Sequence, residues 1–388
     1  WQLRSPPSLD FSRTLMTVMA LGEWHDVALR VTNTGTRHVT IELHDGHPAS
    51  CEVAHLPVTM SLPPGRWLQH AYRCRPTLRG DIEFAPHHVH VLGPTGLVHR
   101  FWRPGTADTA RVFPNFRAVS KHALMGFSRH GAMAGVHLRR RRGHGLEFHQ
   151  LREFRDGDSL RQVDWKSVSR RRQLISREFR EERNQRVVLA IDCGRRMHAR
   201  DGDRSLLDRS LDAALLLSYM ALRQGDAVGV QTFSGASRWL PPVGGQRALR
   251  SILRTVYDLQ STSAPSDYEE AAKSLGARQP RRALVVVLTN LRDDDSADLP
   301  RLLAPLRRRH LVLVASLKDP AISACLREPV GDFDRALRRA AAVEHRARRR
   351  AAHQLLQQQG VAVVDVEPAE LPAALVHRYL EIKRAGLL

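Results

Sequence analysis

The sequence predicts an all-β domain followed by a doubly wound α/β domain, and three observations support this prediction. Short alternating runs separated by turn residues fill residues 1–112. From residue 186 to residue 388, short apolar runs alternate with longer helical patterns. Two of those runs, 187–191 and 283–288, are apolar throughout, as expected of strands buried on both faces of a parallel sheet.

The N-terminal region has the pattern of a β-sandwich. Its expected strands are residues 27–31, 40–43, 58–62, 67–75 and 87–91. Turn signals such as Asn33-Thr34-Gly35 separate them, which predicts an immunoglobulin-like β-sandwich over residues 1–112. Cys51 and Cys74 both fall in this region and could pair, although a reduced state fits equally well. The region carries no catalytic constellation, so we expect a scaffold or a protein contact.

The α/β region alternates strands and helices over the rest of the chain. The expected strands are residues 187–191, 227–233, 283–288, 311–316 and 361–366. The expected helices are residues 206–222, 247–259, 299–308, 335–359 and 371–384. Such alternation predicts an open parallel sheet whose ligands and partners meet the carboxyl ends of the strands.

Charge is the most unusual bulk property. The 388 residues carry a formal net charge of +20, and the sequence pI is about 11.1. This balance favours an acidic partner, which is nucleic acid, anionic lipid or an acidic protein surface; a composition that simply favours arginine explains it equally well. No run of about 18 apolar residues occurs, so no membrane span is expected within these residues. Because the chain begins at Trp1, we expect that upstream sequence precedes it.

Between the two domains, residues 113–185 are expected to form a linker that carries a charged segment. The segment alternates acidic, basic and aromatic residues, namely Glu153, Asp156, Asp158, Arg161, Asp164, Trp165, Lys166 and Arg170. One interpretation is an ion-pair network that Trp165 anchors, with Asp158 capping a short helix. A docking surface for a partner is the second interpretation, and paired carboxylates acting as acid and base are the third. The third is the weakest, because no nucleophile, phosphate loop or metal cluster accompanies them.

These residues also carry a family resemblance. Residues 151–166, followed by Ser169-Arg170 and Arg177-Glu178-Phe179, resemble the signature of domain-of-unknown-function family 58. The elements Asp45-Gly46-His47-Pro48 and Arg79-Gly80 are similar to others in that family. The resemblance implies a von Willebrand factor A-type (Rossmann-type) domain over residues 186–388.

The same resemblance implies a function. Family members are expected to be bacterial, non-enzymatic partners or adaptors of a MoxR-type AAA+ ATPase in a chaperone-like or assembly role. They usually carry two membrane-spanning helices before the sandwich, which implies a place on the cytoplasmic side of the inner membrane. The alternative is a nucleic-acid or anionic-lipid binder driven by the basic surface, with nucleic acid the less favoured partner.

A von Willebrand factor A-type domain typically holds Mg²⁺ on hard oxygen ligands from three loops. The family's first loop often reads Asp-x-Ser-x-Ser, and this chain keeps Asp192 but has Gly194 and Arg196 in place of the serines. The second loop offers Ser266-Asp267, and Asn290 replaces the third-loop aspartate. We therefore expect a degenerate site without metal or cofactor, in which Arg195 or Arg196 pairs with Asp192 or Asp267. The alternative is that Asp192 merely caps a turn.

The helix expected at residues 335–359 is strongly basic. Its arginines are Arg335, Arg338, Arg339, Arg346, Arg348, Arg349 and Arg350. We expect a solvated helix; contact with phosphates or acidic headgroups is the alternative. The helix has no aromatic residues for base stacking, which disfavours single-stranded nucleic acid.

Overall fold

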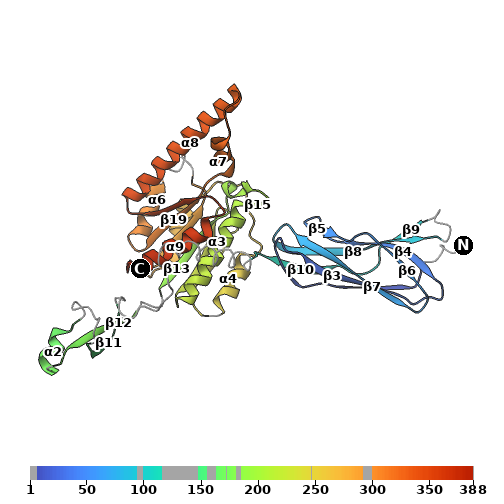
Figure 1. Ribbon diagram of the computed structural model, residues 1–388, viewed down its shortest axis with the longest axis horizontal. Coiled ribbons are helices and arrows are strands. Elements are labelled where there is room, and N and C mark those ends of the chain that lie inside the picture. The colour runs from blue at the N-terminus through green and yellow to red at the C-terminus, as the bar shows by residue number, and fades with distance from the viewer. Residues whose placement is uncertain are drawn as a thin grey trace. The chain divides into compact units, whose positions relative to one another are not determined.

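The structure is a computed structural model that describes residues 7–93, 99–115, 147–154, 163–171, 173–180, 185–245, 247–291 and 299–387. The chain divides into two compact units (Figure 1). One comprises Trp1–Asn115 with Leu253–Leu259, and the other comprises Phe116–Ile252 with Gln260–Leu388. Each unit has a hydrophobic core of its own. Among the described residues, no helix combines the length and the apolar character that a membrane span requires.

The N-terminal unit is a β-sandwich of two sheets. The first has the order β1 (Leu9–Thr14), β3 (His25–Asn33), β7 (Trp67–Pro76) and β5 (Cys51–Ala54). The second has the order β2 (Val18–Ala20), β10 (Asp108–Phe113), β8 (Gly80–Leu92), β4 (Val39–Gly46) and β6 (Val58–Leu62), with β9 (His99–Trp102) beside β8. Pairing is antiparallel except between β2 and β10. The all-β class that the alternating runs predict is therefore present.

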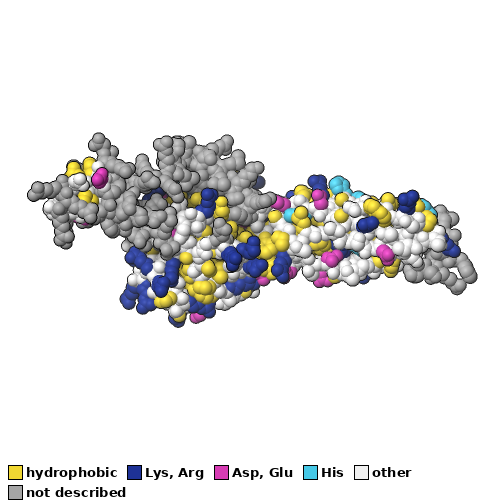
Figure 2. All heavy atoms as spheres, turned by 90° about the horizontal axis from the view of Figure 1, so that it is seen from below, with side chains coloured by type: hydrophobic (Ala, Val, Ile, Leu, Met, Phe, Trp, Pro, Cys, Tyr) yellow, Lys and Arg dark blue, Asp and Glu magenta, His cyan; other side chains and the backbone are white. Residues whose placement is uncertain are grey.

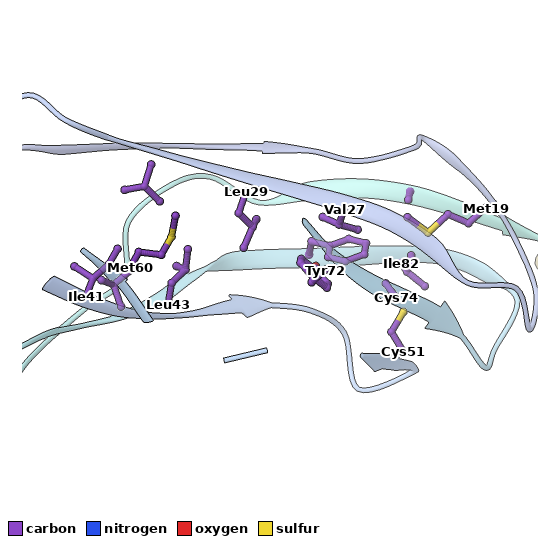
Figure 3. Packing of buried hydrophobic residues seen from close by; sticks show 14 of the residues in the cluster. Met19, Val27, Leu29, Ile41, Leu43, Cys51, Met60, Tyr72, Cys74 and Ile82 are labelled. Carbon is purple, nitrogen blue, oxygen red and sulfur yellow. The ribbon is translucent and has the colours of Figure 1, made fainter. Parts of the chain in front are cut away.

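Alternation along the strands builds the core of the sandwich. On β3, Val27, Leu29 and Val31 are buried while the residues between them are more exposed. They pack against side chains such as Leu43 and Tyr72 from other strands, as Figure 3 shows. Burying one such face of each sheet supplies the main driving force for folding of this unit.

A charged cluster lies inside this apolar core. The Asp45 carboxylate accepts hydrogen bonds from Arg13 (2.6 Å to Nη2) and from the Tyr72 hydroxyl (2.6 Å), and its Oδ1 lies 2.7 Å from Nδ1 of His87. Arg13 also pairs with Asp108 at 2.8 Å. Burial raises the pKa of Asp45, but these hydrogen bonds outweigh it and hold the pKa well below its usual range. No pattern in the sequence predicted this cluster.

The four cysteines are all free thiols in the structure. Cys51, Cys74 and Cys193 are buried, and Cys325 is partly exposed. We expect Ellman's reagent to modify Cys325 rapidly in the native protein and the other three thiols only after unfolding, because a buried thiol cannot meet the reagent. Cys325→Ser should abolish the rapid phase. If Ellman's reagent reacts with only two thiols in the unfolded chain, two of the four cysteines are paired, which would contradict the free thiols of Cys51 and Cys74.

The second unit contains a six-stranded sheet. Its order is β17 (Trp239–Val243), β16 (Ala227–Phe233), β13 (Arg186–Asp192), β18 (Leu284–Thr289), β19 (Leu311–Leu317) and β20 (Ala362–Val366). All neighbours are parallel except β17, which pairs antiparallel with β16. Chain order runs outward from β13 in both directions, so the strand order reverses beside β13. Ligands of open α/β sheets bind at this switch point.

Helices cover both faces of this sheet, as the doubly wound prediction requires (Figure 1). On one face, α3 (Leu206–Arg223) packs against α9 (Leu371–Arg384). On the other face, α5 (Tyr268–Arg278), α6 (Leu299–Arg307) and α8 (Phe333–Gln358) bury apolar side chains against the strands. The remaining elements are η2 (Arg195–His198), β14 (Arg200–Asp201), β15 (Arg204–Ser205), α4 (Ala248–Val256) and α7 (Pro320–Arg327).

Part of the segment expected to be a linker is folded. β11 (Glu147–Glu153) pairs antiparallel with β12 (Ile175–Arg180), and α2 (Trp165–Arg171) lies between them in the chain. Asp164 caps α2, because its Oδ1 accepts a hydrogen bond of 3.3 Å from the Ser167 amide. The described part of residues 113–185 therefore contains a pair of antiparallel strands with a short helix between them in the chain.

Candidate interaction site at the carboxyl edge of the parallel sheet

β13 ends at Asp192, which is completely buried at the switch point of the sheet. Its Oδ1 accepts a hydrogen bond of 2.8 Å from the Gly194 amide. Its Oδ2 accepts hydrogen bonds from the hydroxyls of Ser266 (2.6 Å) and Thr289 (2.7 Å). The Tyr268 hydroxyl lies 2.9 Å from that of Thr289, and it is the donor there if Thr289 gives its only proton to Asp192. Both carboxylate oxygens are thus bonded by the protein itself.

Burial raises the pKa of Asp192 above its ordinary value. The hydrogen bonds and the positive charge of Arg196 act in the opposite direction but do not cancel the loss of solvation. Arg196 itself is only 9% exposed. Water therefore screens its charge only weakly.

The predicted ion pair between an arginine of this loop and Asp192 or Asp267 is wrong. Among the described residues, the donors to Asp192 are one amide and two hydroxyls, and neither Arg195 nor Arg196 is one of them. Asp267 instead caps α5, because its Oδ1 accepts a hydrogen bond of 2.9 Å from the Glu270 amide. Small neutral donors reach a buried carboxylate at less cost than a large solvated cation does.

Glycine at position 194 allows the loops to close on Asp192. A Cβ atom on Gly194 would lie 3.0 Å from the carbonyl oxygen of Ala264 and 3.1 Å from both Asp192 Oδ1 and Ser266 Oγ. A serine at this position, as in the family pattern, would have to displace these neighbours. The glycine is therefore a structural part of the closed arrangement rather than a vacant ligand position.

Hydrogen bonds also link the three loops that surround Asp192. The amide of Arg195 donates to the carbonyl of Ala264 at 2.8 Å. Thr262 donates to Cys193 from its amide (2.7 Å) and to the carbonyl of Ser234 from its hydroxyl (2.6 Å). The outward-facing residues of these loops are exposed, namely Arg195, Gly235, Ala236, Ser237, Ser263, Ala264, Pro265 and Asp267. The edge thus presents an exposed surface on a cross-linked frame.

The loop that follows β18 and contains Asn290 is held by an arginine from α8. Arg349 donates from Nη1 to Asn290 Oδ1 at 3.1 Å and from Nη2 to Ser316 Oγ (2.6 Å) and to the Leu317 carbonyl (2.7 Å). It also pairs with Asp365 on β20 at 2.8 Å. Arg349 is only 6% exposed, so the prediction of a fully solvated helix is wrong at this position. One guanidinium therefore joins the carboxyl ends of β18, β19 and β20.

The signal for Arg349 was present in the sequence. Ala342, Ala352 and Leu356 are buried on α8, and Arg349 shares their face at helical spacing. Its position on this mostly apolar helix face distinguishes Arg349 from the other arginines. Thr289, Tyr268, Ser316 and Asp365 are the other described residues of the site that the sequence did not predict as participants.

The donor set does not fit the Mg²⁺ ion that the family resemblance implies. Mg²⁺ requires near-octahedral oxygen ligands. Here both oxygens of Asp192 and the side-chain oxygen of Asn290 are already engaged by protein donors. Gly194 supplies no ligand, and the Arg196 charge would repel a cation. Among the described residues, no group of three or more His, Cys, Asp or Glu side chains is placed to hold a metal.

We expect Mg²⁺ to leave the thermal stability unchanged. If the dissociation constant exceeds about 10 mM, Mg²⁺ at about 1 mM stabilises the fold by less than ~0.1 kcal/mol. That free energy corresponds to a shift in Tm of less than about 1 °C. Calorimetry in MgCl₂ and in EDTA measures this shift. A rise of several degrees that is absent from Asp192→Asn would show that the ion binds at this edge.

Only part of the charged segment lies among the described residues. Trp165, the predicted anchor, is 65% exposed. Glu153 is exposed and Asp164 caps α2. Asp156, Asp158 and Arg161 lie outside the described residues, as do the side chains of Lys166 and Arg170. The expected ion-pair network therefore stays a prediction.

Comparison with known proteins finds a family model that matches part of this chain. Residues 150–327 match the model of the family described as "Protein of unknown function DUF58". This match confirms the resemblance over the segment from β11 to α7.

The curated relatives are distant. An uncharacterized protein of Bacillus subtilis, YeaD, is 23% identical over 245 residues, which is 63% of this chain and 58% of the relative. An uncharacterized protein of Mycobacterium tuberculosis is 23% identical over 193 residues, which is 49% of this chain and 60% of the relative. The matched part of this chain thus spans less than two thirds of either relative.

Similarity to solved structures is low. An aerotolerance-related membrane protein from Bacteroides fragilis aligns with a TM-score of 0.33 and 16% identity, over 52% of this chain and 100% of that chain. Alpha-2-macroglobulin from Escherichia coli aligns with a TM-score of 0.25 and 17% identity, over 28% of this chain and 17% of that chain.

Proposed function

We propose that this chain is a non-enzymatic protein-interaction module. In this proposal the α/β unit is a von Willebrand factor A-like domain with a degenerate metal site, and the carboxyl edge of its sheet binds a protein partner without metal. The observation that carries the proposal is Asp192, whose oxygens are all satisfied internally while the loops around it are exposed and cross-linked. A partner meeting this edge finds a preorganised surface, which lowers the entropic cost of binding.

The proposed partner is a MoxR-type AAA+ ATPase, in a chaperone-like or assembly role at the cytoplasmic face of the bacterial inner membrane. The family match over residues 150–327 supports this choice, since the family resemblance carries both the partner and the membrane setting. A catalytic role is disfavoured by the chemistry of the edge. The hydroxyls of Ser266 and Thr289 already donate to Asp192, and a carboxylate is a weak base toward a hydroxyl.

Binding of the purified ATPase to full-length variants tests the proposal. Ala236→Arg places a long cation on the exposed edge loop and should weaken binding by at least about tenfold. Ala277→Arg adds the same side chain to an exposed position near the opposite end of α5, and it should bind like the wild type. EDTA should not change the affinity when nucleotide is absent. Equal binding by both variants, or loss of binding in EDTA, would contradict the proposal.

The rival function, binding of nucleic acid or anionic lipid, is favoured by the distribution of charge. On the face of the α/β unit shown in Figure 2, Lys and Arg side chains gather between hydrophobic ones. Salt separates the two functions, because binding to phosphates weakens by orders of magnitude between about 50 and 200 mM salt. Tight binding to generic duplex DNA with that salt dependence would favour the rival.

A further inference from the structure

α8 reaches well past the sheet that anchors it. Its 26 residues run antiparallel to β20, and Arg349 contacts the Leu317 carbonyl at the carboxyl end of β19. Residues 333–348 therefore lie beyond the sheet edge, over roughly 24 Å at 1.5 Å per residue. Figure 1 shows this extension, with α7 packed along it. The extension therefore projects beyond the carboxyl edge of the sheet, the edge at which the loops around Asp192 lie.

The two long faces of α8 differ in what covers them. The buried residues Ala342, Arg349, Ala352, His353 and Leu356 share the face turned toward the domain. The opposite face, here called the outer seam, consists of Phe333, Leu337, Ala340, Glu344, Ala347 and Ala351, all of them exposed. Phe333 is 80% exposed and Leu337 is 61% exposed, although they adjoin at positions i and i+4. Large apolar side chains left open in this way indicate an interaction surface.

The spacing of the outer seam selects a helix as its occupant. Its members follow one another at intervals of four and three residues, the repeat with which two helices pack side by side. The alanines keep the seam shallow, so a second helix can approach closely. Glu344 is the one charged member, and it pairs within α8 with Arg348. A single polar residue in such a seam fixes the register of the partner at some cost in affinity.

The charge beside the outer seam selects an acidic occupant. α8 carries seven arginines against two acidic residues, Asp334 and Glu344. Most of these arginines are exposed, namely Arg335, Arg338, Arg339, Arg346, Arg348 and Arg350. A bilayer is the less suitable occupant, since interfacial helices insert bulky residues and half of this seam is alanine. Opposite charge would also steer an acidic helix to this side of the domain.

We propose that the outer seam of α8 docks an acidic amphipathic helix of a partner protein, next to the edge loops around Asp192. This inference deepens the proposed function, since it rests on a protein partner meeting that same edge. It adds the chemistry of the contact: a helix with apolar residues at a and d positions and carboxylates beside them.

A synthetic peptide tests this inference without the ATPase. The probe is a four-heptad helix with Leu at a and d and Glu at e and g, and the full chain carries a fluorophore on Cys325, which lies on α7 next to α8. The wild type should bind the peptide. Leu337→Glu and Ala347→Arg should each weaken binding by at least about tenfold, because both disrupt the seam. Gln357→Glu, an exposed change at the far end of α8, should have little effect.

The two seam variants distinguish a helix from a charged surface. Ala347→Arg adds positive charge, so it should weaken peptide binding if packing in the seam matters and strengthen it if arginines alone attract the probe. Vesicles of phosphatidylglycerol provide the membrane arm, and binding to them that depends on Leu337 would overturn the proposal. Absence of peptide binding, or equal binding by wild type and seam variants, would also overturn it. Circular dichroism checks that both variants fold.

The outcome is separable from that of the proposed function. If Ala236→Arg weakens ATPase binding while the seam variants bind the peptide like the wild type, the proposed function stands and this inference fails. If the seam variants lose peptide binding while Ala236→Arg binds the ATPase like the wild type, the docking surface stands and the edge loops lose their assigned role.

Discussion

Replacing Arg349 with methionine is expected to lower the free energy of unfolding of the α/β unit by about 3–5 kcal/mol. The substitution keeps the apolar stem but removes the donors to Asn290, Ser316, Leu317 and Asp365. Those acceptors are largely buried, and a buried acceptor that loses its donor bears the full cost of its lost solvation. Arg350→Met, on the exposed neighbour, is the control and should change stability little.

The loss of stability caused by Arg349→Met should depend on pH. Burial raises the pKa of Asp365, but hydrogen bonds from His353 and Arg349 and the charge of Arg349 lower it to about 2. A carboxyl with a lowered folded-state pKa stabilises the fold above its unfolded pKa of about 3.9, and this stabilisation is lost as the pH falls toward 2. The gap between wild type and Arg349→Met should therefore be largest near pH 7 and shrink below pH 4. Urea unfolding at both pH values measures it, and a gap that is constant with pH would contradict the role assigned to Asp365.

Much of the α/β unit could be predicted because its central strands are mostly apolar. The runs that form β13, β16, β18 and β19 are buried on both faces, and β13 and β18 each contain an uninterrupted apolar run of at least five residues. β17 was missed because it is a partly exposed edge strand that contains prolines. In the sandwich, β1 was missed because a buried arginine, Arg13, interrupts its apolar alternation.

The position of the candidate site could be predicted, but its bonding could not. Carboxyl ends of parallel strands share an edge, so Asp192, Ser266 and Asn290 were expected to lie together, and Asp192 does accept a hydrogen bond from Ser266. The closure around Gly194 depends on backbone geometry at the level of tenths of an ångström. Arg349 reaches Asn290 from 59 residues away, and no local pattern specifies that distance.

Replacing Asp45 with asparagine is expected to destabilise the sandwich by about 3–5 kcal/mol. The amide keeps the size of the carboxylate but not its charge, so the buried guanidinium of Arg13 keeps one carboxylate partner, Asp108, which is partly exposed. Tyr72 and His87 lose a charged acceptor at the same time. The wild type should show this stabilisation above about pH 4 and lose it as the pH falls, because the pKa of Asp45 is held low.

A double-mutant cycle separates the charge effect from loss of packing. If the cost arises from an uncompensated cation, Arg13→Met combined with Asp45→Asn should be less destabilised than Asp45→Asn alone, because the second change removes the stranded charge. Amide hydrogen exchange assigns the loss to the sandwich rather than to the α/β unit, since each unit has its own core. A double variant whose loss equals the sum of the two single losses would show that Arg13 and Asp45 act separately. Asp45 would then be a hydrogen-bond acceptor for Tyr72 and His87 rather than the counterion of Arg13.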